Sequence, residues 1–173
     1  GLVSKRVIFV EGITDYNYLT KFKQLYKQEK KVKLNLAFLP VGGLGDPKNS
    51  NDEKAKHLIE ELPELIDRHA ILLVDNDGKG KSFQKQAEKC KDLTVVRIDE
   101  AFEDSQAKST IEEIETLFSQ ADRERHKEIL QAKSKPNESG SVASRVFKNG
   151  DVFKNDDFKL EEQTKENFFT LLE

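Results

Sequence analysis

The sequence contains no methionine and no tryptophan, and it has one cysteine, Cys90, among 173 residues. A single cysteine excludes an internal disulfide and is typical of a reducing compartment, so we expect a cytoplasmic location. A translated chain begins with methionine, so we expect this chain, which begins with Gly1, to be a piece of a longer protein. No apolar run approaches the roughly 20 residues of a membrane span and no signal peptide opens the chain, so we expect no membrane association.

An excess of positive charge is also missing. The chain has 29 Lys and Arg residues against 32 Asp and Glu residues, which gives a net charge of -3. General nucleic-acid-binding domains are usually basic, so any nucleic-acid contact here must come from a local basic patch. Charged residues make up 35% of the chain and hydrophobic residues 36%, whereas about 25% charged is usual. We therefore expect one domain with a compact core and a heavily charged surface.

Four short apolar runs alternate with amphipathic stretches in the first hundred residues. Such runs are typical of strands that are buried on both faces of a parallel sheet. Pro63 should kink or restart the second helix, and Thr14 is a candidate cap for the first. The predicted strands are residues 7–10, 34–41, 71–74 and 93–98, with predicted helices at 16–26, 58–66 and 83–91. This alternation predicts an α/β fold, with a parallel sheet of about four strands and helices on both faces.

The strand signal fades after residue 98, and helical patterns follow. Helices are predicted for residues 109–118, 122–133 and 161–172, with a loop at 134–140. We therefore divide the chain into a catalytic core, residues 1–105, and a helical C-terminal appendage of the same domain, residues 106–173.

Acidic residues follow two of the predicted strands. Glu11 ends the first strand, with Asp15 one turn into the next helix, and Asp75 and Asp77 follow the third strand. Ligands bind at the carboxyl ends of strands in open parallel sheets. Converging carboxylates repel one another unless a hard cation such as Mg²⁺ or Mn²⁺ neutralises them. We therefore predict a metal site that acts on phosphoryl groups; the alternative is that each acid merely caps a helix N-terminus.

Two motifs resemble a known family. Residues 10–15, VEGITD, resemble the VEGxxD motif of Toprim domains, and residues 75–80, DNDGKG, resemble their DxDxxG motif after the third strand. The resemblance covers about residues 5–100 and includes the glycine-rich loop after the second strand. Residues 114–122 resemble the helix that follows the Toprim core in the OLD (overcoming lysogenisation defect) family. This favours the OLD family over topoisomerases, primases and RNA-maturation nucleases, which also contain Toprim domains.

The resemblance implies a Mg²⁺- or Mn²⁺-dependent endonuclease that hydrolyses DNA phosphodiester bonds. Two ions would clamp the attacking and leaving oxygens. In OLD proteins the Toprim domain follows an ABC-type ATPase and a dimerisation region. The resemblance therefore implies these upstream partners, a homo-oligomer formed through them, and a role in phage defence.

The resemblance also implies residue roles. Glu11, Asp15, Asp75 and Asp77 would be metal ligands, and Glu11, Asp75 and Asp77 would be catalytic. OLD proteins add an acid from the later helix. Glu115 is the first candidate and Glu112 the second, because on an ideal helix Glu115 lies closer to the apolar stripe of Ile111, Ile114, Leu117 and Phe118.

Lysines complete the predicted site. The family uses a lysine near the end of the domain to stabilise the transition state. Lys154 is the first candidate for this catalytic lysine and Lys148 is the second. Lys79, Lys81 and Lys85 come directly after the DxD pair, and we expect them to contact DNA phosphates.

Other functions fit parts of the sequence. Residues 71–78 also resemble the strand-DxDG motif of haloacid-dehalogenase-like phosphatases, in which residues 156–157 would serve as the late acidic pair. In that family the motif lies near the start of the domain, whereas a complete β-α-β-α unit precedes it here. A primase-like or RNA-processing Toprim activity and a non-catalytic metal-binding domain are further alternatives.

Overall fold

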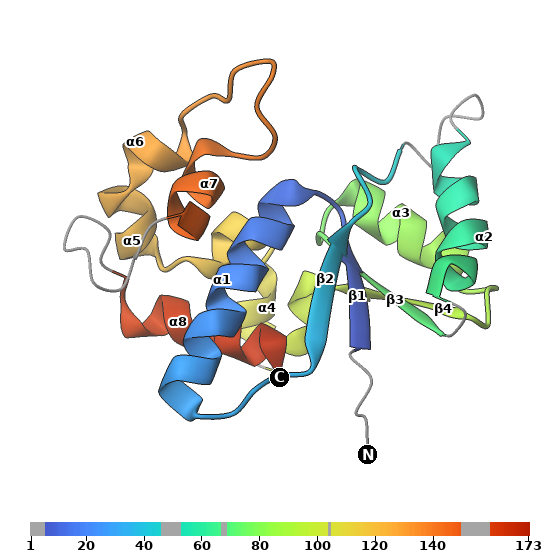
Figure 1. Ribbon diagram of the computed structural model, residues 1–173, viewed down its shortest axis with the longest axis horizontal. Coiled ribbons are helices and arrows are strands. Elements are labelled where there is room, and N and C mark those ends of the chain that lie inside the picture. Colours follow the sequence, from blue (N-terminus) through green and yellow to red (C-terminus); the bar gives the residue numbers. More distant parts are fainter. Residues whose placement is uncertain (1–5, 46–52, 67–68, 104, 150–159) are drawn as a thin grey trace.

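A parallel sheet forms the centre of the fold, as the sequence predicts. The computed structural model describes residues 6–45, 53–66, 69–103, 105–149 and 160–173. Its strands are β1 (Arg6–Val10), β2 (Leu36–Pro40), β3 (Ala70–Val74) and β4 (Leu93–Arg97). They are all parallel and lie in the order β2-β1-β3-β4 (Figure 1). The α/β fold class is therefore confirmed.

Helices cover both faces of the sheet. The helices α2 (Lys54–Ile66) and α3 (Gly78–Ala87) lie on one face, and α1 (Ile13–Lys30) and α8 (Glu162–Leu172) on the other (Figure 1). Consecutive strand residues pack on opposite faces of the sheet. Phe9 belongs to the hydrophobic cluster under α2 and α3, whereas Val10 belongs to the cluster under α1. Both sides of each strand are thus covered by protein, which explains why the strands are apolar runs rather than alternating patterns.

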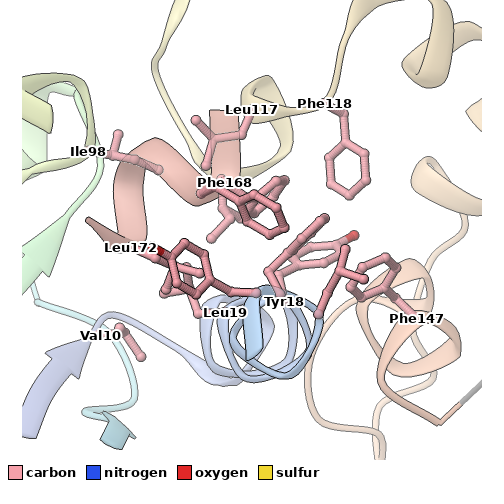
Figure 2. Close-up of a cluster of buried hydrophobic side chains, with 14 of the residues drawn as sticks. Val10, Tyr18, Leu19, Ile98, Leu117, Phe118, Phe147, Phe168 and Leu172 are labelled. Carbon is pink, nitrogen blue, oxygen red and sulfur yellow. The ribbon is translucent and has the colours of Figure 1, made fainter. Parts of the chain in front are cut away.

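The C-terminal helices share the core cluster of α1. Tyr18 of α1 meets Phe118, Phe147 from α7 (Val142–Asn149) and Phe168 from α8 (Figure 2). Phe22 of α1 contacts the same three rings. The rings of Phe22 and Phe168 are stacked, with centroids 3.7 Å apart, and Tyr18 meets Phe118 edge-on at 5.3 Å. The helical C-terminal part therefore packs directly on the first helix of the sheet layer.

Several predicted element boundaries are wrong. The helix expected at 109–118 is two elements, α4 (Ser105–Thr110) and the 3-10 helix η2 (Ile114–Leu117). The helix expected at 122–133 is also divided, α7 was not predicted, and α2 continues through Pro63 without a restart. The remaining elements are the 3-10 helix η1 (Ile98–Ala101), α5 (Gln120–Arg125) and α6 (Lys127–Leu130).

Thr116 explains why the chain leaves the helix between α4 and η2. Its hydroxyl oxygen accepts the backbone N–H groups of Glu112 at 3.0 Å and Glu113 at 3.2 Å. Threonine side chains compete in this way with the backbone acceptors of a continuous helix.

Within the described ranges, no helix is long and apolar enough to cross a membrane.

Candidate functional site

The two predicted motifs meet at the reversal point of the sheet. β1 and β3 are neighbours, and the chain leaves β1 towards β2 on one side and β3 towards β4 on the other. The carboxyl ends of such a strand pair flank a crevice in which α/β proteins bind ligands. Glu11 follows β1 and Asp75 follows β3, and the backbone N–H of Asp75 donates to Oε1 of Glu11 at 3.2 Å.

Asp15 and Asp77 both bond to the starts of helices. Oδ2 of Asp15 accepts the N–H of Gly12 at 3.0 Å at the start of α1, and Oδ1 of Asp77 accepts the N–H of Gly80 at 2.7 Å at the start of α3. Helix capping therefore accounts for part of the role of these two acids. It does not account for Glu11 and Asp75, which precede the capping residues of their helices.

The carboxylates oppose one another's ionisation. Burial, and after it the charges of Glu11, Asp15, Asp77 and Glu115, raise the pKa of Asp75 to about 9. Burial followed by the charge of Glu11 raises the pKa of Asp15 to about 6. The pKa of Glu11 is also raised, mainly by burial. These five residues thus form one interacting group, which we call the acidic cluster.

Glu115, rather than Glu112, belongs to this cluster. Glu115 is half-buried in η2, and burial together with the charges of Glu113 and Asp15 raises its pKa to about 7. The side chain of Glu112 is exposed, and the contact of Glu112 with the site is its backbone carbonyl, which accepts the N–H of Asn76 at 2.7 Å. The ideal-helix argument gave the same preference, although this segment is not one continuous helix.

The donor chemistry of the acidic cluster suits a hard divalent cation. All five side chains offer carboxylate oxygens, which are the ligands that Mg²⁺ and Mn²⁺ prefer. A cation would also offset the burial and the repulsion that together raise the pKa values. Within the described residues, no three His, Cys, Asp or Glu side chains are already arranged as a metal-binding group. The metal site therefore stays a prediction.

The predicted lysines differ in their placement. Lys79 lies near the acidic cluster, because its charge lowers the pKa of Glu11, whereas Lys81 and Lys85 are exposed along α3. Lys154 lies outside the described residues, as do residues 156–157. The ammonium group of Lys148 lies 4.9 Å from the ring centre of Tyr16, the residue after Asp15.

Two glycines allow close backbone approach around the acids. A Cβ on Gly80 would lie 2.0 Å from the carbonyl oxygen of Asp75, so the last residue of the DxDxxG motif has no room for a side chain. Gly43, in the loop after β2, has a φ of +94° and donates its N–H to the carbonyl of Glu11 at 2.6 Å. The glycine-rich loop therefore lies against the acidic edge.

The segment before α7 contacts the start of α1. The N–H of Ser141 donates to Oγ1 of Thr14 at 2.9 Å, and Nδ2 of Asn17 donates to Oγ of Ser144 at 3.2 Å. Thr14 is therefore not the helix cap that the sequence suggested, since Gly12 occupies the N-cap position. Sequence reasoning missed this contact because its partners are 127 residues apart.

Comparison of the chain with protein-family models, with curated proteins and with solved structures finds no match. The fold and the site define an α/β domain with an acidic cluster at the reversal point of its sheet. Any function must therefore be argued from the residues of this chain.

Proposed function

We propose that the chain is a metal-dependent DNA endonuclease of the Toprim type, the nuclease module of an OLD-family ATPase-nuclease. The observation that carries the proposal is that four acids, Glu11, Asp15, Asp77 and Glu115, all act electrostatically on Asp75, whose backbone N–H also bonds to Glu11. The pKa values of Asp75, Asp15 and Glu115 are raised as a result of burial and of these neighbouring charges. Structural carboxylates are usually exposed or paired with bases, and clusters of carboxylates with raised pKa values are typical of functional sites.

The residues of the acidic cluster would have different roles in catalysis. Asp15, Asp75, Asp77 and Glu115 would hold Mg²⁺ or Mn²⁺, which when bound supplies a Lewis acid for the phosphate and a more acidic water. Glu11 would be either a further ligand or the general base, and burial raises its pKa, which makes its carboxylate a stronger base.

Lysines would provide the contact with the substrate. Lys79, beside Glu11, would neutralise a phosphate oxygen next to the scissile bond, and Lys81 and Lys85 would contact neighbouring phosphates. An acidic module with three such lysines binds DNA weakly by itself. The proposal therefore includes an upstream ATPase and dimerisation region, through which the parent oligomerises and holds DNA during phage defence.

The test is cleavage of plasmid DNA by the chain with Mg²⁺ or Mn²⁺. The Asp75→Asn, Asp77→Asn double variant should lose all metal-dependent cleavage. Asp92→Asn is the matched control, because Asp92 is an exposed acid just before β4, at the amino edge of the sheet, and this variant should cut normally. Equal cutting by the double variant would sink the assignment.

Further substrates separate the alternatives. Cleavage of single-stranded or structured RNA in preference to DNA would favour an RNA-processing Toprim enzyme. Release of phosphate from small phosphomonoesters, without DNA cleavage, would favour a haloacid-dehalogenase-like phosphatase. Binding of Mn²⁺ in calorimetry with no turnover of any of these substrates would favour a non-catalytic metal-binding domain.

A further inference from the structure

Asn76 connects the DxD turn to the segment that carries Glu115. Its backbone N–H donates to the carbonyl of Glu112 at 2.7 Å, and its side-chain Nδ2 donates to the carbonyl of Ile111 at 3.0 Å. One residue therefore holds two consecutive carbonyls of a segment that follows it by 35 residues. Because Asn76 stands between Asp75 and Asp77, this connection is made at the centre of the acidic cluster.

The orientation of the Asn76 amide is fixed by this contact. Its Oδ1 is buried and has no hydrogen-bond partner among the described residues. Rotating the amide would place Oδ1 against the carbonyl oxygen of Ile111, so only the observed orientation allows a hydrogen bond. The side chain thus acts as a donor to the later segment.

The segment that Asn76 holds is itself well fixed. Ile111 and Ile114 are buried in the core cluster of α1. The Thr116 hydroxyl accepts the N–H groups of Glu112 and Glu113 and donates to the Glu113 carbonyl at 2.5 Å. Movement of this turn relative to Asp75 would therefore move Glu115 with it.

Electrostatic repulsion works against this arrangement. Carboxylates of like charge repel one another, so the acidic side chains push the later segment, which carries Glu115, away from the DxD turn. The two hydrogen bonds of Asn76 act in the opposite direction.

We propose that Asn76 is a positioning residue that docks Glu115 into the acidic cluster and so completes the ligand set for a divalent cation. This inference rests on the proposed function, since the cation is the ligand. The geometry that carries it is the pair of hydrogen bonds from Asn76 to the carbonyls of Ile111 and Glu112. Partners that orient metal ligands change metal affinity by about 10–100-fold when they are removed.

The test is a double-mutant cycle on Mn²⁺ affinity, measured by titration calorimetry on the whole chain. Asn76→Ala should weaken Mn²⁺ binding by about 10–100-fold. In a Glu115→Gln background the same substitution should cause little further loss, because Asn76 acts through Glu115. Equal losses in both backgrounds, or no loss in either, would overturn the role of Asn76.

Asn76→Asp provides a second variant of almost the same size. Its added carboxylate would by itself strengthen cation binding, so weaker Mn²⁺ binding supports the loss of positioning, whereas equal or stronger binding overturns it. Near-ultraviolet circular dichroism verifies that each variant is folded. If the unaltered chain fails to bind Mn²⁺, the proposed function and the role of Asn76 both fall; if it binds and the variants match it, only Asn76 loses its role.

Discussion

At the scale of single residues, Asp75 is the described carboxyl group with the most strongly raised pKa. Its pKa rises from 3.8 to about 9, first because it is buried and then because four acidic neighbours surround it. A folded state that keeps a proton which the unfolded chain releases loses stability as pH rises. The stabilising effect of this proton is complete below about pH 4 and is lost as pH rises towards 9.

Asp75→Asn should therefore stabilise the metal-free protein at pH 8. The neutral amide removes the ionisation that burial opposes, and we expect the free energy of unfolding to rise by about 1–3 kcal/mol. Urea denaturation at pH 5 and pH 8 measures this, and the gain should be smaller at pH 5. Asp92→Asn, at an exposed position, is the control and should change stability by less than about 0.5 kcal/mol. A loss of stability at pH 8 would contradict the electrostatic account.

Divalent cations should counteract the loss of stability at high pH. The pKa values of Asp15, Glu115 and Asp75, about 6, 7 and 9, mean that protons occupy these carboxylates at pH 5. Protons and cations compete for the same oxygens, so Mn²⁺ should raise the unfolding temperature more at pH 8 than at pH 5. Thermal unfolding with and without about 5 mM Mn²⁺ measures this. That concentration is of the order of the dissociation constant of a millimolar site. The same increment at both pH values would mean that the cation binds elsewhere.

At the scale of elements, the turn from β3 to α3 carries three residues with proposed roles in the site, Asp75, Asp77 and Lys79, within six residues. Gly80 packs against the carbonyl of Asp75 and donates its N–H to the capping side chain of Asp77, so the path of this turn requires a residue without a side chain at position 80. Gly78, two residues earlier, has open space around the position of a Cβ. The two glycines are therefore a matched pair for testing this turn.

Gly80→Ala should destabilise the protein by about 1–3 kcal/mol, because the added methyl group forces the Asp75 carbonyl to move. Gly78→Ala should be neutral or stabilising by up to about 1 kcal/mol, since alanine has the higher helix propensity. Chemical denaturation compares the two variants. Equal effects at both positions would refute the close packing of Gly80 on Asp75.

The stacked rings between α1 and α8 offer a second test at this scale. Phe168→Ala removes a buried ring that lies 3.7 Å from Phe22, and it should cost about 3–5 kcal/mol of folding free energy. Leu65→Ala is the control, because Leu65 is 72% exposed on α2 and should contribute less than about 0.5 kcal/mol. Denaturant midpoints give both values. A small effect of Phe168→Ala would mean that α8 is not part of the cooperative core.

Sequence patterns predicted elements well where the local signal and the tertiary environment agree. The strands were found because both faces are buried, so the apolar runs are continuous, and Glu11 and Asp75 were found because they end those runs. The division at Glu112 was missed because the Thr116 side chain competes for backbone donors, which periodicity does not register. Helix α7 was missed because it is short and depends on the packing of Phe147 against α1.

The start of α3 and the hydrogen bonds of Asn76 to the later segment were missed for related reasons. The Gly-Lys-Gly sequence at 78–80 resembles a loop, but the Asp77 side chain supplies the acceptor that starts the helix there. Asn76 is the variable position of a DxD pattern, and its first partner, Ile111, lies 35 residues away in sequence. Such contacts are set by topology, so periodicity and spacing along the chain cannot predict them.

At the scale of the whole molecule, charge is unevenly distributed although the net charge is only -3. The acidic cluster occupies the carboxyl edge of the sheet, and three lysines, Lys79, Lys81 and Lys85, follow it along α3. Among the described residues, none of these lysines forms an ion pair. Their charges are thus available for an anionic partner beside the acidic cluster.

Replacing the three α3 lysines by glutamine should weaken DNA binding and reduce its dependence on salt. Each phosphate contact contributes about 0.9 to the slope of log affinity against log salt concentration, so the slope should fall by about 2–3. The matched control replaces three exposed lysines at the far end of α1, which changes the net charge equally but lies away from the acidic cluster: Lys27, Lys31 and Lys33.

Fluorescence anisotropy of a labelled DNA duplex, titrated at several KCl concentrations in EDTA so that nothing is cut, gives both slopes. A reduced slope in the α3 variant alone would mean that DNA lies along α3 and reaches the acidic cluster from that side. Equal slopes in the two variants would mean that only net charge matters. A slope reduced only in the control variant would mean that DNA binds at the far end of α1. No carboxylate of the acidic cluster could reach a phosphodiester bond there. The two lysine sets carry the same charge, so a difference between their slopes would show that the position of the basic residues, and not their number, controls DNA binding.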